Sequence, residues 1–336
     1  MGISSENLLV DPFGRQINYL RLSVTDRCNF RCIYCMSEEM EFLPKSKVLT
    51  LEELYLIGKA FNELGVSKIR LTGGEPLVRN DIISLVKKLS SLPGLVELVM
   101  TTNGALLQHM ALPLKEAGVK RLNISIDSLD RRSFRNLTRY GNLEQVESGI
   151  SAALEAGFKR IKLNSVILNG KNDSEVIDLV NFARDKDLDL SFIEEMPLGN
   201  IDTHERKETL MTSAKLRDLI NSHYALKSLG EPGKLDGPSR YYAMEGSSTK
   251  VGFISPHSNN FCHLCNRVRV TAEGRLLLCL GHENSIDLRA IIRDENADFD
   301  DLKMAIVAGL TNKPLRHEFK ENQEPAVLRF MNATGG

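Results

Sequence analysis

The sequence predicts an α/β protein: a partial (incomplete) TIM-type βα barrel of six parallel strands, with a smaller C-terminal α+β domain. Between residues 17 and 195, strand-like and helix-like segments alternate along the chain. Strand–helix units in series are typical of a parallel sheet covered by helices. Near residue 200 the alternation gives way to a polar, charge-rich stretch, and shorter strand-like runs follow. We therefore place the barrel at residues 1–200 and the second domain at residues 201–336.

Strand-like segments in the first part of the chain have the short apolar pattern of buried strands. They are Ile17–Val24, Lys68–Thr72, Val96–Thr102, Arg121–Ile126, Arg160–Val166 and Asp189–Ile193. In a βα barrel, the loops after the carboxyl ends of the strands carry the chemistry. We therefore look for functional residues directly after these segments.

Helix starts are marked by two candidate capping boxes, in which the first residue and a residue three positions later bond each other's backbone. Thr50 and Glu53 form the first, in front of a segment with apolar residues on one helical face. Asn172 and Glu175 form the second, in front of another periodic segment. Both pairs predict where a barrel helix begins.

The second part of the chain predicts shorter elements. We expect strands at Arg240–Met244, Lys250–Ile254, Arg267–Thr271 and Arg275–Cys279, and helices near Asp287–Arg293 and Phe299–Leu310. The last residues are small and mostly polar, which is typical of a flexible chain end.

Composition excludes several classes of partner. The chain has 336 residues, of which 42% are hydrophobic, so it can bury a sizeable core. A formal net charge of −1 provides no global positive field for nucleic acid. No apolar run approaches the roughly 18 residues of a membrane helix, and the first residues lack the layout of a signal peptide. We expect a cytoplasmic protein with neither a nucleic-acid partner nor a membrane partner.

Cysteine usage points to metal. The six cysteines form two groups of three, Cys28, Cys32 and Cys35, and Cys262, Cys265 and Cys279. Disulfides belong to oxidising compartments, and we see no export signal. Short, odd-numbered cysteine clusters in an intracellular chain indicate metal ligands instead.

The first group, Cys28-x3-Cys32-x2-Cys35, follows the first predicted strand at its carboxyl end. A loop of this length can wrap three thiolates around one corner of a cubane cluster. Such a cluster usually takes four cysteines, so three leave one iron open to a small molecule. The alternative is a structural zinc site with a remote fourth ligand.

The second group has Cys262 and Cys265 in a C-x2-C pair, with Cys279 thirteen residues further on. His282 lies three residues past Cys279, so zinc coordination by three cysteines and this histidine is chemically sensible. Spacing alone does not separate zinc from an iron–sulfur cluster at this site.

The spacing of the first group resembles the radical S-adenosylmethionine superfamily, and so does the segment Thr72–Pro76, which reads TGGEP after the second strand. The resemblance implies a [4Fe–4S] cluster whose open iron binds the amino and carboxylate groups of S-adenosyl-L-methionine (SAM). Electron transfer from that cluster then cleaves SAM to methionine and a 5'-deoxyadenosyl radical. The SAM contacts that the resemblance implies are Tyr34, Gly74, Ser125 and Met196.

Longer matches resemble the GTP 3',8-cyclase family over almost the whole chain: Asp11–Arg15, Tyr19–Asn29, Cys262–Arg269 and the terminal Gly335-Gly336. Ser37 departs from the family, whose members usually have proline there, and this affects the local turn only. The resemblance implies a second [4Fe–4S] cluster on the second cysteine group. The GTP contacts that it implies are Arg21, Arg70, Thr101, Lys162, Arg267, Val268 and Arg269.

The family resemblance also implies a reaction and partners. The radical abstracts the ribose 3' hydrogen of GTP, the sugar attacks C8 of guanine, and reduction yields 3',8-cyclo-7,8-dihydro-GTP for molybdenum cofactor biosynthesis. The implied partners are a flavodoxin- or ferredoxin-like electron donor and a downstream cyclic pyranopterin monophosphate synthase, and a homodimer stays open. We expect Gly335 and Gly336 to enter the barrel mouth and bring the terminal carboxylate toward a pocket arginine, without touching either cluster.

Two other functions remain to be separated from this one. A radical SAM enzyme with an auxiliary cluster could modify a peptide or an RNA instead of GTP. A non-catalytic electron-transfer protein or zinc-stabilised scaffold would make no 5'-deoxyadenosine. Binding of GTP discriminates the first alternative, and SAM cleavage discriminates the second.

Overall fold

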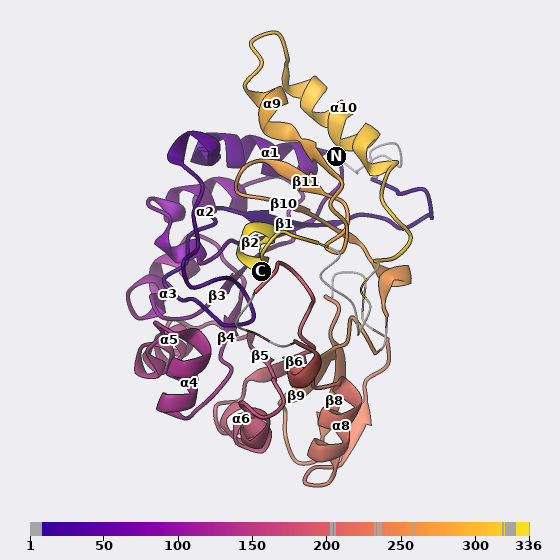
Figure 1. Cartoon of the computed structure of the whole chain (residues 1–336). Coiled ribbons are helices and arrows are strands. Elements are labelled where there is room, and N and C mark those ends of the chain that lie inside the picture. The colour runs from indigo at the N-terminus through magenta and orange to yellow at the C-terminus, as the bar shows by residue number, and fades with distance from the viewer. Residues whose placement is uncertain are drawn as a thin grey trace.

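A single open sheet organises the computed structural model (Figure 1). The structure describes residues 9–201, 204, 206–231, 233, 237–258, 260–317, 319 and 327–335. The strands in these ranges are β1 (Tyr19–Ser23), β2 (Lys68–Thr72), β3 (Glu97–Thr102), β4 (Arg121–Ser125), β5 (Ile161–Val166), β6 (Asp189–Ile193), β7 (Leu226–Ser228), β8 (Arg240–Met244), β9 (Lys250–Ile254), β10 (Arg267–Val270), β11 (Arg275–Leu277) and β12 (Ser285–Asp287). Their order across the sheet is β12-β11-β10-β1-β2-β3-β4-β5-β6-β9-β8-β7.

The six strands expected in the first part of the chain, β1 to β6, are present, and each pairs in parallel with the next. The parallel part of the sheet is larger than we expected, because β10 pairs in parallel with β1, and β9 with β6. The antiparallel partners of these two strands then continue the sheet at each edge. The C-terminal strands therefore extend the same mostly parallel α/β sheet at both edges. The division into two domains near residue 200 stays a prediction.

Helices cover the outer side of the parallel strands (Figure 1). The first six are α1 (Leu51–Glu63), α2 (Ile82–Ser90), α3 (Leu107–Glu116), α4 (Arg131–Thr138), α5 (Leu143–Glu155) and α6 (Val176–Asp185). The others are α7 (Arg206–Thr209), α8 (Ser213–Asn221), α9 (Leu288–Ile292), α10 (Phe299–Leu310) and α11 (Met331–Thr334). Thr50 and Glu53 form the predicted capping box at the start of α1. The short α11 has buried residues and sits near the centre of the view, so the chain end is packed.

The second predicted capping box is wrong. Neither Asn172 nor Glu175 makes a side-chain cap hydrogen bond. Nδ2 of Asn172 donates instead to the carbonyls of Asp127 and Val166, at 2.6 and 3.0 Å. Glu175 accepts from the Ser128 hydroxyl at 2.7 Å. Both side chains tie together the loops that follow β4 and β5, a tertiary role that local spacing does not reveal.

Alternation along the strands separates an apolar core from a polar interior, because successive side chains point to opposite faces. On β1, Leu20 and Leu22 are fully buried in the core against the helices. Tyr19 and Arg21 of the same strand line a cavity on the other face. Strands β2 and β4 repeat this arrangement, so the inner face of the sheet supplies many polar side chains to the cavity.

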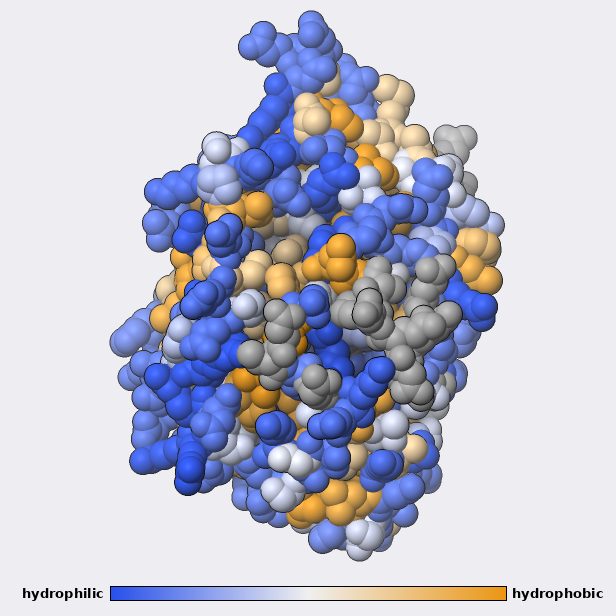
Figure 2. Space-filling model, viewed as in Figure 1, coloured by the Kyte–Doolittle hydropathy of each residue, from blue (hydrophilic) through white to orange (hydrophobic). Residues whose placement is uncertain are grey.

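The described helices are all too short or too polar to cross a lipid bilayer. On the face shown in Figure 2, hydrophilic residues predominate and apolar residues form small, separated patches. Since ordinary folded proteins also expose scattered apolar groups, this face needs no special explanation.

Candidate active site

A cavity of about 410 Å³ lies on the inner face of the sheet. All six cysteines line it, although the two groups come from opposite ends of the chain. The other residues expected at a SAM or GTP site line it as well: Tyr34, Gly74, Ser125, Met196, Arg21, Arg70, Thr101, Lys162, Arg267, Val268 and Arg269. Gly335 lies beside the cavity, and Gly336 lies outside the described residues. One cavity thus joins the two cysteine groups and the predicted cations.

The first cysteine loop is seated on the TGGEP segment. The Gly74 N–H donates to the Thr25 carbonyl at 2.9 Å, and the Glu75 N–H donates to the Arg27 carbonyl at 2.8 Å. A Cβ added at Gly74 would lie 2.5 Å from the Arg27 carbonyl oxygen. Glycine is needed at this position because the chain leading into the cysteine loop occupies the space of a side chain.

Glu75 and Asn103 extend this support toward the first cysteine. The backbone N–H of Asn103 donates to Oε2 of Glu75 at 2.6 Å, and its Nδ2 lies 3.9 Å from Sγ of Cys28. Burial raises the pKa of Glu75 to about 7. Burial and the nearby Glu75 carboxyl raise the pKa of Cys28 to about 11, and burial raises that of Cys35 to about 12. Metal binding at this loop must therefore displace protons from the thiols.

Three residues of the predicted SAM site gather beside this loop. The Tyr34 hydroxyl donates to Oδ2 of Asp127 at 2.6 Å, and Oδ1 of Asp127 accepts from the Val166 N–H at 2.8 Å. Burial raises the pKa of Asp127 to about 6. Ser125 ends β4 and Met196 follows β6, so both enter the cavity from the carboxyl ends of strands.

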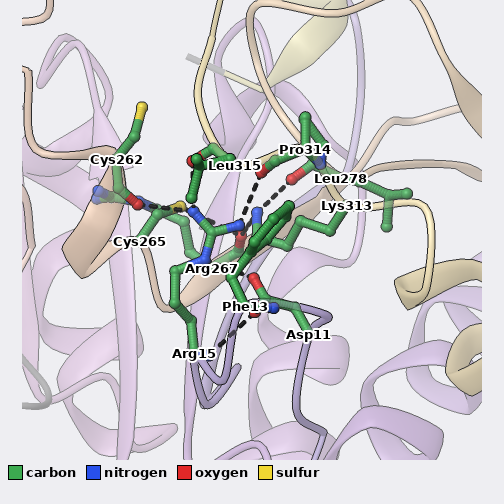
Figure 3. A network of polar contacts seen from close by, with 10 residues as sticks. All are labelled: Asp11, Phe13, Arg15, Cys262, Cys265, Arg267, Leu278, Lys313, Pro314 and Leu315. Atoms are coloured by element: carbon green, nitrogen blue, oxygen red, sulfur yellow. Dashed lines mark hydrogen bonds and ion pairs between the residues drawn. The ribbon is translucent and has the colours of Figure 1, made fainter.

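In the second cysteine group, Cys262 and Cys265 lie just before β10, and Cys279 lies just after β11. Burial raises the pKa of the Cys265 thiol, but the cations of Arg267 and Lys313 outweigh burial and lower it to about 6. Arg15 donates to the Cys262 carbonyl at 2.7 Å and holds this loop against the segment after α10 (Figure 3). Cations therefore outweigh burial at Cys265, whereas at Cys28 burial and the Glu75 carboxyl outweigh the cation of Arg31, which donates to the Cys28 carbonyl at 2.6 Å.

A row of arginines crosses three neighbouring strands. Arg21 of β1 is in register with Arg269 of β10 and with Arg70 of β2. Burial and, next, the charge of Arg267 lower the pKa of Arg269 to about 10. Burial and Arg269 hold the pKa of Arg21 well below its usual range. Clustered buried cations of this kind are unfavourable without an anion between them.

Hydroxyl groups accompany the cations. Nη1 of Arg70 donates to Oγ1 of Thr101 at 3.0 Å, and its Nε donates to the Tyr19 hydroxyl. Although burial raises the pKa of Tyr19, the surrounding arginines and a lysine lower it to about 7. Nζ of Lys162 lies 5.9 Å from the centre of the Tyr241 ring. Burial lowers the pKa of Lys162. The cavity interior is thus strongly cationic.

The chain end is inserted into the same site. The Gly335 carbonyl accepts from Arg269 and Arg21, at 3.0 and 3.2 Å. The Met331 N–H donates to the Cys35 carbonyl at 3.2 Å. The segment that precedes the two glycines, α11, therefore packs directly on the first cysteine loop.

Family comparisons agree with this geometry. A model of the radical SAM superfamily matches residues 22–183, and a model named Molybdenum Cofactor Synthesis C matches residues 188–319. A GTP 3',8-cyclase of Pseudomonas entomophila (strain L48) is 55% identical over 329 residues, which cover 98% of each chain. GTP 3',8-cyclase 2 of Pseudomonas aeruginosa (strain PAO1) is 56% identical over 333 residues, covering 99% of this chain and 100% of that one. The chain belongs to the GTP 3',8-cyclase family.

A solved structure also has the same fold as this chain. Streptococcus suis SuiB bound to its precursor peptide SuiA has a TM-score of 0.63 at 15% identity, covering 96% of this chain and 77% of that one. An identity this low shows a common fold only.

Membership of the GTP 3',8-cyclase family brings SAM and two [4Fe–4S] clusters as cofactors, and the residues present fit them. All six thiols are free. Among the described residues, no three His, Cys, Asp or Glu side chains converge on a position for a single ion. In a [4Fe–4S] cluster each thiolate binds a different iron, so the ligands stand further apart. His282 bonds to the Arg316 carbonyl at 3.0 Å, which does not support the zinc alternative.

Several residues that line the cavity were not predicted from the sequence. Tyr19 and Lys68 lie two residues before Arg21 and Arg70, so strand alternation alone would have found them. Tyr241 and Asn332 have no such signal, because the segments that carry them reach the cavity only through tertiary packing.

Proposed function

We propose that this protein converts GTP to (8S)-3',8-cyclo-7,8-dihydroguanosine 5'-triphosphate, the first step of molybdenum cofactor biosynthesis. The observation that carries the proposal is the one cavity lined by both cysteine groups and by a row of arginines, of which Arg70 is buried and the others are half-buried. Family membership supports the same reaction. The cavity supplies two cluster sites, a cationic wall and space for small molecules between them.

At one end of the cavity, we assign the SAM site to the residues around the first cysteine loop. Cys28, Cys32 and Cys35 are the proposed ligands of its cluster. Tyr34, Gly74, Ser125 and Met196 are the proposed SAM contacts, and all line the cavity. The bond from Tyr34 to Asp127 fixes the tyrosine ring next to the loop, which supports a role in positioning the adenine.

At the other end, we assign the second cluster to Cys262, Cys265 and Cys279. Beside it we assign GTP binding to Arg21, Arg70, Thr101, Lys162, Arg267, Val268 and Arg269. Guanidinium groups bind phosphate oxygens through planar, paired hydrogen bonds. An uncompensated buried charge costs several kcal/mol, so a triphosphate would relieve the repulsion among these cations.

When bound, the first cluster and SAM supply the 5'-deoxyadenosyl radical that removes the ribose 3' hydrogen. The role of the protein is to hold the ribose between the two cysteine groups. Arginines on the inner face of the sheet fix the phosphates, and the buried walls exclude water. Holding a reactant at both ends raises its effective concentration at the reacting centre and can lower the barrier by roughly 7–11 kcal/mol.

The tail completes the site in this proposal. The Gly335 carbonyl engages Arg21 and Arg269, so the chain end orients two of the cations that we assign to GTP. Gly336 would continue the chain from this point.

The wider setting of the reaction also remains a proposal. It includes a six-strand partial barrel as the radical SAM domain at residues 1–200 and an auxiliary-cluster domain at residues 201–336. It also includes cytoplasmic location, a flavodoxin- or ferredoxin-like electron donor and a downstream cyclic pyranopterin monophosphate synthase. A homodimer is compatible with it.

Peptide modification is the second candidate, since SuiB, which shares the fold, has been solved with its precursor peptide. Equilibrium binding of GTP to anaerobically reconstituted protein separates the two. We expect micromolar or tighter binding that weakens at least tenfold in Lys162→Met, a buried cavity cation. The exposed Lys120→Gln should bind as the wild type does. Absence of GTP binding in the wild type would contradict the proposal and leave the peptide alternative in place.

A further inference from the structure

Lys313 is a buried lysine next to the second cysteine group. It follows α10 and is only 3% exposed. Its Nζ donates to the Arg267 carbonyl at 3.0 Å and to the Leu278 carbonyl (Figure 3). Among the described residues, no carboxylate lies within ion-pair distance of this ammonium group. None of the described carboxylates therefore balances the charge of Lys313.

Arg15, in the same neighbourhood, provides a contrast. Its Nε is paired with the fully buried carboxylate of Asp11. Its other nitrogens donate to the carbonyls of Cys262, Pro314 and Leu315, at 2.7, 2.7 and 2.8 Å. The Arg15–Asp11 pair is neutral as a unit and clamps three segments together (Figure 3). Arg15 thus also holds together the segments around the second cysteine group.

The position of Lys313 indicates which charge it balances. Leu278 directly precedes Cys279, and Arg267 lies two residues after Cys265. Both carbonyls that bind the ammonium group therefore belong to the backbone of the second cysteine group. An ammonium group has three donors, and the described residues account for two of them. A buried charge requires a partner of opposite sign, and among the described residues Lys313 acts electrostatically on the thiols of Cys265 and Cys279.

Lys313 also differs from the other cations near these cysteines. Arg267 and Arg269 line the cavity, and Arg269 already binds the Gly335 carbonyl. Lys313 is not part of the cavity lining. A substrate in the cavity would therefore draw on the arginines and leave the charge of Lys313 in place.

We propose that Lys313 is a positioning residue whose fixed positive charge balances the thiolates of the second cluster and raises its reduction potential. Reduction adds negative charge to a cluster, and a nearby cation in a low-dielectric interior favours that reduced form. The proposal rests on the second-cluster assignment within the proposed function. It does not depend on which substrate occupies the cavity.

The test is a potentiometric titration of the anaerobically reconstituted full-length protein, followed by electron paramagnetic resonance. The second-cluster signal is the one lost in Cys265→Ser. Lys313→Gln keeps hydrogen-bond donors and removes the charge, whereas Lys313→Arg keeps the charge. Lys120→Gln removes an exposed cation as the matched control.

We expect Lys313→Gln to lower the reduced-to-oxidised ratio of the second cluster about tenfold at fixed potential, which equals about 59 mV for a one-electron couple. Lys313→Arg and Lys120→Gln should stay close to the wild type, and the first-cluster signal should not move. An unchanged second-cluster potential in Lys313→Gln, at full iron content, would overturn the proposal.

Loss of the second cluster is also informative. If Lys313→Gln fails to retain that cluster while Lys313→Arg retains it, charge is required and the proposal stands. If both variants lose it, the site needs the shape of lysine, and the charge role is refuted. Measuring GTP binding in parallel distinguishes failure of the proposed function from failure of the Lys313 proposal. If the wild type does not bind GTP, the proposed function is contradicted, but the reduction potential of the second cluster can still be compared between the variants.

Discussion

The backbone carbonyl of Gly335 lies 3.0 Å from Nη1 of Arg269 and accepts a hydrogen bond from it. Arg21 donates to the same oxygen at 3.2 Å. Gly335 has a φ of 78°, and a Cβ added there would lie 2.6 Å from Oγ1 of Thr72. Only glycine fits this position without strain. The chain end is therefore built into the row of cations that we assign to GTP.

Deleting Gly335 and Gly336 should lower cyclised product roughly tenfold or more, since a hydrogen bond to a charged group contributes about 1.5–3 kcal/mol. Iron content and thermal stability should stay nearly unchanged, because the rest of α11 keeps its contacts. Product is measured by chromatography after anaerobic turnover. A peptide ending in two glycines, added separately, should restore part of the activity. Unaltered turnover in the truncated protein would return the tail to a passive terminus.

Asn332 links the tail to the first cysteine loop. Its Nδ2 donates to the Asp26 carbonyl at 3.0 Å, and the residue is 1% exposed. Asn332→Ala leaves that carbonyl unpaired, so we expect unfolding free energy to fall by about 1–3 kcal/mol. Denaturant titration measures the change, with the exposed Asn312→Ala as control. Equal stability of the two variants would show that this contact is not formed in solution.

Gly74 tests how the first cysteine loop is supported. Gly74→Ala would place a Cβ 2.5 Å from the Arg27 carbonyl oxygen and force the loop away. We expect iron to fall from about eight to about four per chain, as one of two four-iron clusters is lost. Gly237→Ala is the control, because a Cβ there meets nothing within 4 Å. Full iron content in Gly74→Ala would mean that the loop tolerates the displacement.

Cysteine variants separate the roles of the two groups. Cys35→Ser should abolish 5'-deoxyadenosine formation, because its cluster is the one proposed to act on SAM. Cys265→Ser should weaken GTP binding and product formation while leaving some uncoupled SAM cleavage. Quantifying 5'-deoxyadenosine and cyclised product in parallel provides the comparison. Complete loss of cleavage in both correctly folded variants would refute this division of roles.

Local patterns predicted most of the parallel sheet and its helices. β1 to β6 occur where apolar strand segments precede periodic helices, and Thr50 caps α1 as its spacing indicates. Strands β9 and β10 were predicted, but their parallel pairing with β6 and β1 could not be, because they join the sheet only after a long excursion of the chain. The side chain of Asn172 illustrates the same limit, since its partners lie in loops that the fold brings together.

Only some residues of the candidate site could be predicted from the sequence, for a similar reason. Cysteine spacing and family motifs identified residues that line the cavity. Lys313 and Asn332 carry no local motif, because their importance arises from carbonyls that become their neighbours only in the folded chain. Buried polar groups with distant partners are therefore the part of this site that requires a structure.

The most direct test of the central claim uses GTP carrying deuterium at the ribose 3' position. The reconstituted protein is incubated anaerobically with this substrate, SAM and a strong reductant, and both products are examined by mass spectrometry. The proposed function predicts 5'-deoxyadenosine that contains deuterium, formed together with 3',8-cyclo-7,8-dihydro-GTP. Formation of 5'-deoxyadenosine without deuterium, with GTP recovered intact, would contradict it.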